Sequence, residues 1–195
     1  LSEVKLDKSY ALVITTNGGL WRYLIGDIIQ FTSLVPFRIK VIGRTKSYIN
    51  TFGEELMIHN TDTAITNSCK KYNCSINDYT VAPILSKNQT GGHQWFIEFG
   101  KKPQNLNLFM KEIDNQIKKL NSDYEAKRYN NIILKLPELV VIENNEFYLW
   151  LEENDKLGGQ HKMPRLTENR AIAERILSFK RSFQQNALQK ANKSN

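Results

Sequence analysis

The sequence predicts an α+β protein made of two parts, a strand-rich segment over residues 1–43 and a compact α+β domain over residues 53–175. The first forty residues carry runs of β-branched and aromatic side chains, which favour strands. Beyond residue 53, stretches with apolar residues at steps of three and four, typical of amphipathic helices, alternate with strand-like runs. Helices mixed with antiparallel strand pairs in this order are typical of the α+β class.

Four strands are expected in the N-terminal segment, at residues 10–15, 20–24, 28–33 and 37–42. Asn17-Gly18-Gly19 supplies a turn after the first strand, because these residue types tolerate positive φ. Pro36 separates the last two strands. So small a sheet has open edges and is not stable as a domain alone, so we expect it to be the end of a larger domain.

The second part opens with a predicted helix over residues 54–72 and strands at 78–85 and 94–99. Its clearest helix covers residues 103–120, where Leu106, Phe109, Ile113 and Ile117 share one face. Pro103 suits the first turn of this helix. We interpret the apolar stripe as core packing rather than as part of a cofactor site.

A short helix is expected over residues 123–129, with Tyr124 and Arg128 bracing the domain by packing. Three strands are predicted next, from the segments "NIILKL", "ELVVIE" and "EFYLWLE". A polar loop containing Gly158-Gly159 follows, and a final helix is expected from about Ala171.

Composition narrows the class of protein. With 41% hydrophobic residues over 195 positions, the chain can bury a real core. No apolar run approaches the roughly 18 residues of a membrane span, and the first ten residues lack a signal-peptide core. Cys69 and Cys74 are expected as reduced thiols, and with three scattered histidines they offer no zinc-ligand spacing. We therefore expect a cytoplasmic protein with no membrane association and no metal held by its own side chains.

The formal net charge is +7, but its distribution is uneven. Residues 176–195 hold Lys180, Arg181, Lys190 and Lys193 and no acidic residue. We interpret this segment as a solvated basic tail, which argues against a nucleic-acid partner. The alternative is a non-catalytic basic α+β module that binds nucleic acid or an acidic partner.

Three polar islands could carry chemistry: Gly26-Asp27, Gly43 to Lys46 and Gly158 to Arg165. Asp27 is either a turn former between two strands or a carboxylate at the rim of a pocket. The sequence contains no phosphate loop, no dinucleotide-binding glycine motif and no nucleophile elbow. A complete active site is therefore not visible in this chain.

Taken together, these islands resemble a known arrangement. "YALVITTNGGLWRYLIGD" resembles a motif of the Gretchen Hagen 3 family, the acyl acid amido synthetases of the adenylate-forming superfamily. "RIKVIGRTKSYINTFGEEL" resembles the superfamily's hinge motif, and "NSDYEAKRYN" and "GGQHKMPRL" resemble the C-terminal domain of the family's bacterial branch. The resemblance covers about residues 1–170 and implies the C-terminal portion of a protein more than twice as long.

The resemblance implies a reaction. ATP with Mg²⁺ and a carboxylic acid would give an acyl-adenylate and pyrophosphate, and an amine or amino acid would then displace AMP. The phosphate-binding loop and the acyl pocket would lie in the upstream domain of the same protein. We therefore expect the isolated chain to be inactive. A family member that has lost catalysis and serves as a scaffold is a further possibility.

The resemblance also implies roles for residues of the first part. Asp27 would hold the ribose hydroxyls of the nucleotide, because a carboxylate has two acceptor oxygens. Gly26 would allow close approach of the backbone, and Tyr23 belongs to the same cofactor-binding motif. Arg44 would reach the ribose or the adjacent phosphate; the alternative is a solvent-exposed charge.

Two lysines complete the implied site. Lys46 would be the pivot of a hinge over residues 44–52, which absorbs rotation of the C-terminal lid. Lys162 would reach the α-phosphate during adenylation; the alternative is an interface or surface lysine. Arg165 is expected to anchor the loop of Lys162. Plant members of the family carry Asp-Lys-Thr after the hinge, with the lysine near the nucleotide. This chain reads "FGEEL" there, so Glu54 or Glu55 occupies that neighbourhood and the lysine's role is not carried over.

Overall fold

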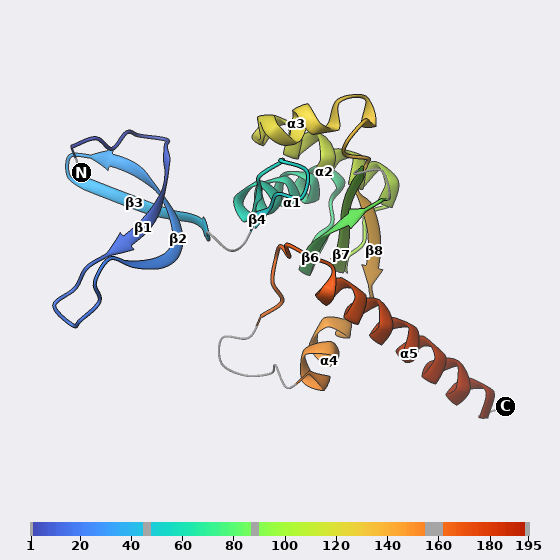
Figure 1. Ribbon diagram of the computed structural model, residues 1–195. Coiled ribbons are helices and arrows are strands. Elements are labelled where there is room, and N and C mark those ends of the chain that lie inside the picture. The colour runs from blue at the N-terminus through green and yellow to red at the C-terminus, as the bar shows by residue number, and fades with distance from the viewer. Residues whose placement is uncertain (1, 45–47, 87–89, 155–161, 194–195) are drawn as a thin grey trace.

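The computed structural model describes residues 2–44, 48–86, 90–154 and 162–193, and they form two regions (Figure 1). The first is a three-stranded sheet, and the second combines a further three-stranded sheet with helices on both of its faces. The α+β class predicted from the sequence is confirmed. Within the described residues, no helix is both long and apolar enough to cross a bilayer.

The N-terminal sheet has the order β1-β2-β3 and is antiparallel throughout. Its strands are β1 (Ser9–Ile14), β2 (Tyr23–Leu34) and β3 (Phe37–Arg44). The predicted break between residues 24 and 28 is wrong, because Gly26 and Asp27 lie inside β2. Gly26 takes a φ of 91°, and β1 pairs on both sides of it with a register shift. A glycine and a bulge thus replace the expected turn.

Large apolar side chains are exposed on this first region. Ile28, Ile29 and Phe31 are buried, whereas Trp21 is 79% exposed and Val35 is 92% exposed. Leu20, Tyr23, Leu24, Ile25, Phe37, Ile39 and Val41 are also exposed. Apolar surface gathered in this way is normally covered by another part of a protein.

The second region contains a sheet of order β6-β7-β8 and a separate two-stranded ribbon, β4 with β5. Strands β6 and β7 are antiparallel, whereas β7 and β8 are parallel. In chain order its elements are β4 (Tyr48–Ile49), β5 (Leu56–Met57), α1 (Ile58–Tyr72), β6 (Ser75–Leu85), β7 (Gly91–Lys101), α2 (Leu106–Leu120), α3 (Ser122–Arg128), a 3₁₀ turn (Tyr129–Asn131), β8 (Glu138–Ile142), α4 (Glu146–Glu153) and α5 (Ala171–Lys193).

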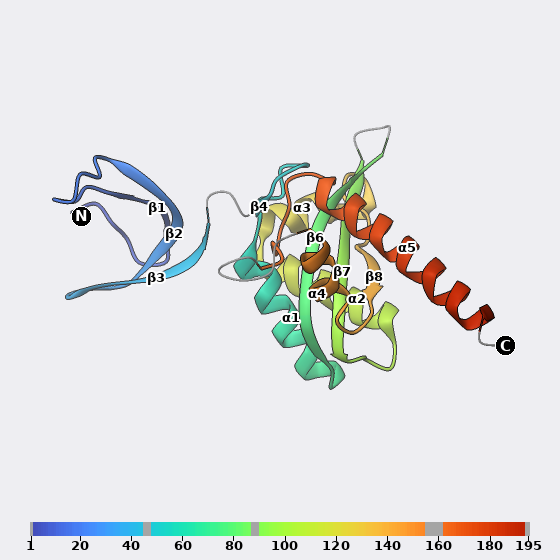
Figure 2. The same ribbon diagram turned by 90° about the horizontal axis from the view of Figure 1, so that it is seen from below.

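Alternate residues of β7 feed two separate cores, as the period of a strand requires. Trp95 and Ile97 pack with α1, α2 and α3 on one face, whereas Phe96 packs with α4 and α5 on the other (Figure 1, Figure 2). The stripe predicted on α2 is confirmed as core packing, with Phe109 and Ile113 fully buried. The sheet is therefore the middle layer of the region.

Helix α2 begins at Leu106, so Pro103 lies outside it, contrary to the prediction. Three further predictions for the second region are wrong. The segment "EFYLWLE" is helix α4, with Phe147 and Trp150 on its buried face at helical spacing. The segment "NIILKL" forms only an isolated bridge from Leu134 to Gly91. Helix α1 begins at Ile58 rather than at residue 54, because the residues before it form a turn closed by β4 and β5.

The final helix begins at Ala171, as predicted. The expectation of a solvated tail from residue 176 is wrong for the first turns of that segment. Ile176 is 2% exposed in the second core, and Lys180 Nζ lies 3.1 Å from the buried carboxylate of Glu146. These turns of α5 are part of the folded region.

Candidate functional site

The residues expected to hold a nucleotide gather at one end of the β2–β3 hairpin. Asp27 is directly opposite Arg44 in the backbone register, and Ile28 is opposite Gly43. The structure therefore brings the backbones of Asp27 and Arg44 together from positions 17 residues apart in the sequence. This end of β3 leads toward the second region (Figure 1).

The loop before β2 is shaped by local hydrogen bonds. Thr16 N–H donates to Leu20 O at 2.9 Å, and Arg22 N–H donates to the Thr15 hydroxyl at 3.1 Å. Arg22 has a φ of 46°, a conformation that is uncommon for a residue with a side chain. Tyr23 follows at the start of β2 with its side chain exposed, three positions before Gly26.

Lys162 belongs to the second region, where its side chain is exposed at the start of an anchored segment. Met163 is buried in the second core. The next residue, Pro164, accepts a hydrogen bond from the Thr80 hydroxyl at 2.6 Å. Thr167 N–H donates to Val81 O at 3.0 Å. Lys46 and residues 155–161 lie outside the described residues.

Two structural expectations from the sequence are confirmed. The guanidinium of Arg165 pairs with Asp78 and lies 4.4 Å from the ring centre of Tyr79, so Arg165 anchors its segment to β6. Tyr124 and Arg128 both bind Asp114: the Tyr124 hydroxyl donates to its Oδ1 at 2.8 Å, and Arg128 Nε lies 2.7 Å from the same oxygen. They brace α3 against α2.

The carboxylate of Asp114 has three side-chain partners. Lys118 Nζ lies 2.6 Å from Oδ2, in addition to the bonds from Tyr124 and Arg128. Burial favours the neutral acid, but these donors outweigh it and hold the pKa of Asp114 below its usual value. Burial, followed by the charge of Asp114, raises the pKa of Tyr124. Asp114 is thus ionised and Tyr124 neutral near pH 7.

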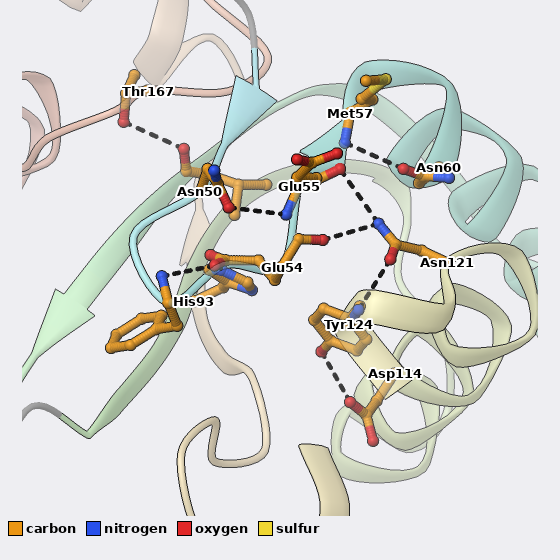
Figure 3. Close-up of polar contacts among 12 residues, drawn as sticks. Asn50, Glu54, Glu55, Met57, Asn60, His93, Asp114, Asn121, Tyr124 and Thr167 are labelled. Carbon is orange, nitrogen blue, oxygen red and sulfur yellow. Dashed lines mark hydrogen bonds and ion pairs between the residues drawn. The ribbon is translucent and has the colours of Figure 1, made fainter. Parts of the chain in front are cut away.

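Between β4 and β5, residues 50–55 form a turn that is held by side-chain hydrogen bonds, which we call the Glu54 turn (Figure 3). Glu54 is 0% exposed, and its Oε1 lies 2.8 Å from His93 Nε2 on β7. The other oxygen, Oε2, accepts the Phe52 N–H at 2.6 Å. Glu54 is therefore a structural carboxylate with partners on both oxygens.

The backbone of the Glu54 turn is held from two further sides. Asn121 donates from Nδ2 to Glu54 O at 2.9 Å and to Glu55 O at 3.2 Å, while Asn50 Oδ1 accepts the Glu55 N–H at 3.2 Å (Figure 3). Glu55 takes a φ of 42°, in the left-handed region that non-glycine residues avoid. These bonds stabilise it there and leave its side chain exposed.

A cavity of about 240 Å³ lies where the two regions meet. It is lined by Ile28 of β2 and, from the second region, by Tyr48, Asn50, Glu55 and Met57. Ile28 follows Asp27 in β2, so the cavity lies one residue along the strand from the expected nucleotide end, although Asp27 is not among its lining residues. Tyr48 and Asn50 also line a second cavity of about 240 Å³ together with Thr51 and Glu168.

Few features of the sequence indicate the Glu54–His93 pair. Glu54 appeared only as a departure from the family pattern, and His93 only as one of three scattered histidines. The available signal is that His93 shares a strand face with the apolar Trp95 and Ile97, because a buried imidazole there needs a polar partner.

Other candidate chemistry is limited. The described residues contain no group of three or more histidine, cysteine or acidic side chains arranged to hold a metal ion. Cys69 and Cys74 are free thiols, as expected. Burial, followed by a bond to Cys74, raises the pKa of Cys69 to about 12, which makes it a poor nucleophile near pH 7.

Comparison with known proteins accounts for both regions. Residues 1–44 match the GH3 family central domain, and residues 59–171 match the GH3 family C-terminal domain. Over 186 residues the chain is 30% identical to an indole-3-acetic acid-amido synthetase, GH3.10 of Arabidopsis thaliana, covering 89% of this chain and 31% of that protein.

Solved structures show the same fold. The chain superposes on GH3.15 acyl acid amido synthetase with a TM-score of 0.71 at 22% identity, covering 90% of this chain and 33% of the other. A structure described as AtGH3.15 in complex with 2,4-DB gives a TM-score of 0.70 at 21% identity, with the same coverage. The chain spans about a third of the length of these relatives. With one region matching the central domain and the other the C-terminal domain, in that order, this chain belongs to the GH3 (Gretchen Hagen 3) family.

Proposed function

We propose that this chain is the C-terminal part of an ATP-dependent acyl acid amido synthetase, which joins a carboxylic acid to an amine or amino acid through an acyl-adenylate. The observation that carries the proposal is the match to two successive GH3 domains, together with 30% identity to an amido synthetase over 89% of the chain. The chemistry is that of an acid–amine ligase that releases pyrophosphate and then AMP.

In this proposal the Asp27 end of β2 serves the nucleotide. The Asp27 carboxylate accepts hydrogen bonds from both ribose hydroxyls, and Gly26, with its φ of 91°, lets the backbone approach the sugar. Arg44, opposite Asp27 in the register, contributes positive charge beside the ribose or the phosphate. Tyr23 supplies an exposed ring on the same strand. The arrangement of Asp27 and Arg44 at one hairpin end supports this assignment.

Lys162 is proposed to act on the α-phosphate during adenylation. An ammonium group near the reacting phosphorus offsets negative charge that develops as the acid attacks and pyrophosphate leaves. Lys162 stands in the other region from Asp27, so the two meet only if the C-terminal region rotates toward the nucleotide. Since Tyr48 and Ile49 already pair with β5, we place the pivot in the part of the expected hinge before residue 48, which includes Lys46.

The substrate classes and the cofactor of the full protein are also part of this proposal. The names of the relatives point to a carboxylic acid such as indole-3-acetic acid or 2,4-DB and to an amine acceptor, and we propose these classes for the full protein. ATP would be bound with Mg²⁺, mainly by the upstream domain, whose contact surface includes the exposed apolar side chains of β1–β3. A cytoplasmic location and membership of the bacterial branch stay predictions.

The test is acid-dependent exchange of pyrophosphate into ATP by the full-length protein across a panel of carboxylic acids. Asp27→Ala and Lys162→Ala are each expected to lower exchange at least tenfold. Glu125→Ala and Lys111→Ala, which remove exposed charges on α3 and α2, are the matched controls and should leave it within twofold. A folded protein that shows no exchange with any acid but binds nucleic acid would instead favour the basic binding module.

A further inference from the structure

The Glu54–His93 pair is an unusual feature of the core. Both side chains are essentially inaccessible to solvent, at 0% and 1% exposed, and their nearest atoms are 2.8 Å apart. Removing two ionisable groups from water is costly, and apolar residues of similar volume often stabilise a fold as well or better. A role in fixing one specific conformation is therefore a better explanation for this pair than a contribution to stability.

The conformation that the pair fixes is that of the Glu54 turn on β7. His93 and Gly91 are two positions apart and so lie on the same face of the strand. A Cβ at Gly91 would come within 2.6 Å of the Phe52 ring, which shows that the ring presses on the bare backbone there. Phe52 on Gly91 and Glu54 on His93 are thus two adjacent attachment points between the turn and the strand.

The third attachment point comes from the junction of α2 and α3. Asn121 caps α3 through its Oδ1, which accepts the Tyr124 N–H at 2.8 Å, and its Nδ2 binds the carbonyls of Glu54 and Glu55. The Tyr124 ring stacks on His93 with 5.8 Å between ring centres. The Glu54 turn is therefore attached to the body of the second region through β7 and through α3 (Figure 3).

The contacts that hold the Glu54 turn leave the side chain of Glu55 exposed. With its neighbour's side chain buried and its own φ at 42°, Glu55 lies on the exposed side of the turn, where it lines the cavity shared with Ile28. Lys162, which the proposed function assigns to adenylation, is not among the residues that line this cavity. In this structure the second region borders that cavity through two residues of the Glu54 turn, Asn50 and Glu55, and through the flanking Tyr48 and Met57.

We propose that Glu54 and His93 are positioning residues for the amide-forming step: they hold the Glu54 turn, and with it Glu55, in the one shape that docks against the Ile28 end of β2. The inference rests on the proposed function. Loss of the pair leaves adenylation largely intact, because that step uses Lys162, and slows attack of the amine on the acyl-adenylate.

The first experiment measures hydrogen exchange in this chain itself. In Glu54→Ala, the amides of Phe52 and Glu55 are expected to exchange at least tenfold faster. The amide of Val81, which donates to Arg165 O at 2.9 Å on β6, should keep its rate. Unchanged exchange at Phe52 and Glu55, or faster exchange of all three amides alike, would overturn the inference. This experiment decides the attachment even if the full-length protein proves to have no ligase activity.

The second experiment separates the two half-reactions in the full-length protein. Pyrophosphate exchange reports adenylation, and single-turnover consumption of preformed acyl-adenylate by the amine reports amide formation. Glu54→Ala and His93→Gln are each expected to lower the second rate at least tenfold and the first by less than threefold. Glu54→Gln, which keeps an acceptor for Phe52 N–H and a partner for His93, should recover most of the second rate.

Glu112→Gln is the matched control, because it breaks a carboxylate–cation contact of 2.6 Å with Lys71 that is remote from the turn. It should leave the ratio of the two rates unchanged. Equal loss of both rates in the Glu54 and His93 variants would indicate a merely structural role and would contradict the proposal. If Glu54→Ala does not fold, His93→Gln is judged by the same ratio. Absence of exchange in the unmodified protein would refute the proposed function instead.

Discussion

The two regions of this chain differ in how they bury their aromatic residues. In the second region Trp95 is 0% exposed, and its indole stacks on Tyr79 between the sheet and the helices. In the first region Trp21 is 79% exposed on the loop before β2. The second region therefore completes its own core, whereas the strands of the first form one layer that no second layer covers among the described residues.

The largest loss of stability is expected from a substitution in the core of the second region. Trp95→Ala should destabilise the second region by about 4 kcal/mol, because it removes a fully buried indole and leaves a cavity beside Tyr79. Denaturant unfolding followed by circular dichroism measures this loss. A loss below about 1 kcal/mol would show that the core collapses around the gap and is less tightly packed than the structure indicates.

The next effect concerns the buried charges around Asp114. Arg128→Ala should cost about 3 kcal/mol, because it leaves that carboxylate buried without the guanidinium that binds both of its oxygens. Glu143→Ala is the control, since the pair between Glu143 and Lys102 is exposed and 3.4 Å apart. Equal unfolding midpoints for the two variants would contradict the assigned importance of the buried pair.

The same carboxylate predicts a pH dependence. The pKa of Asp114 is lower in the folded protein than in the unfolded chain, so the unfolded chain binds more protons there as the pH falls. Its stabilisation is complete above the unfolded pKa of about 3.9 and is lost as the pH falls through the folded value. Unfolding midpoints between pH 6 and pH 2 should fall less steeply in Asp114→Asn. An unchanged slope would assign the acid sensitivity to other carboxylates.

The smallest effect is expected in the first region. Trp21→Ala should change the free energy of unfolding of this chain by no more than about 0.5 kcal/mol, because the ring contributes little buried surface here. In the full-length protein the same substitution should cost more if an upstream domain covers the loop. Thermal unfolding of both forms gives the comparison, and equal costs would show that Trp21 stays exposed in the longer protein.

Sequence patterns identified the long, strongly periodic elements and missed those that depend on distant contacts. Helix α2 was predictable because its apolar residues repeat over fifteen positions. Helix α4, with eight residues, is too short for periodicity to distinguish it from a strand. Asp27 was recognised as a candidate, but its place inside β2 depends on a bulge. The Glu54–His93 pair joins positions 39 residues apart, which no local pattern specifies.

The anchoring of the segment after Lys162 limits how that lysine can travel. Met163 is buried, and residues 164–167 are bonded along β6, so the backbone of Lys162 is attached on its C-terminal side to the central sheet. A lysine on an unattached loop could reach a substrate by local loop motion, which is faster than the rotation of a domain. If Lys162 acts in adenylation as proposed, the sheet moves with its backbone, and the rate of its delivery is that of a domain rotation.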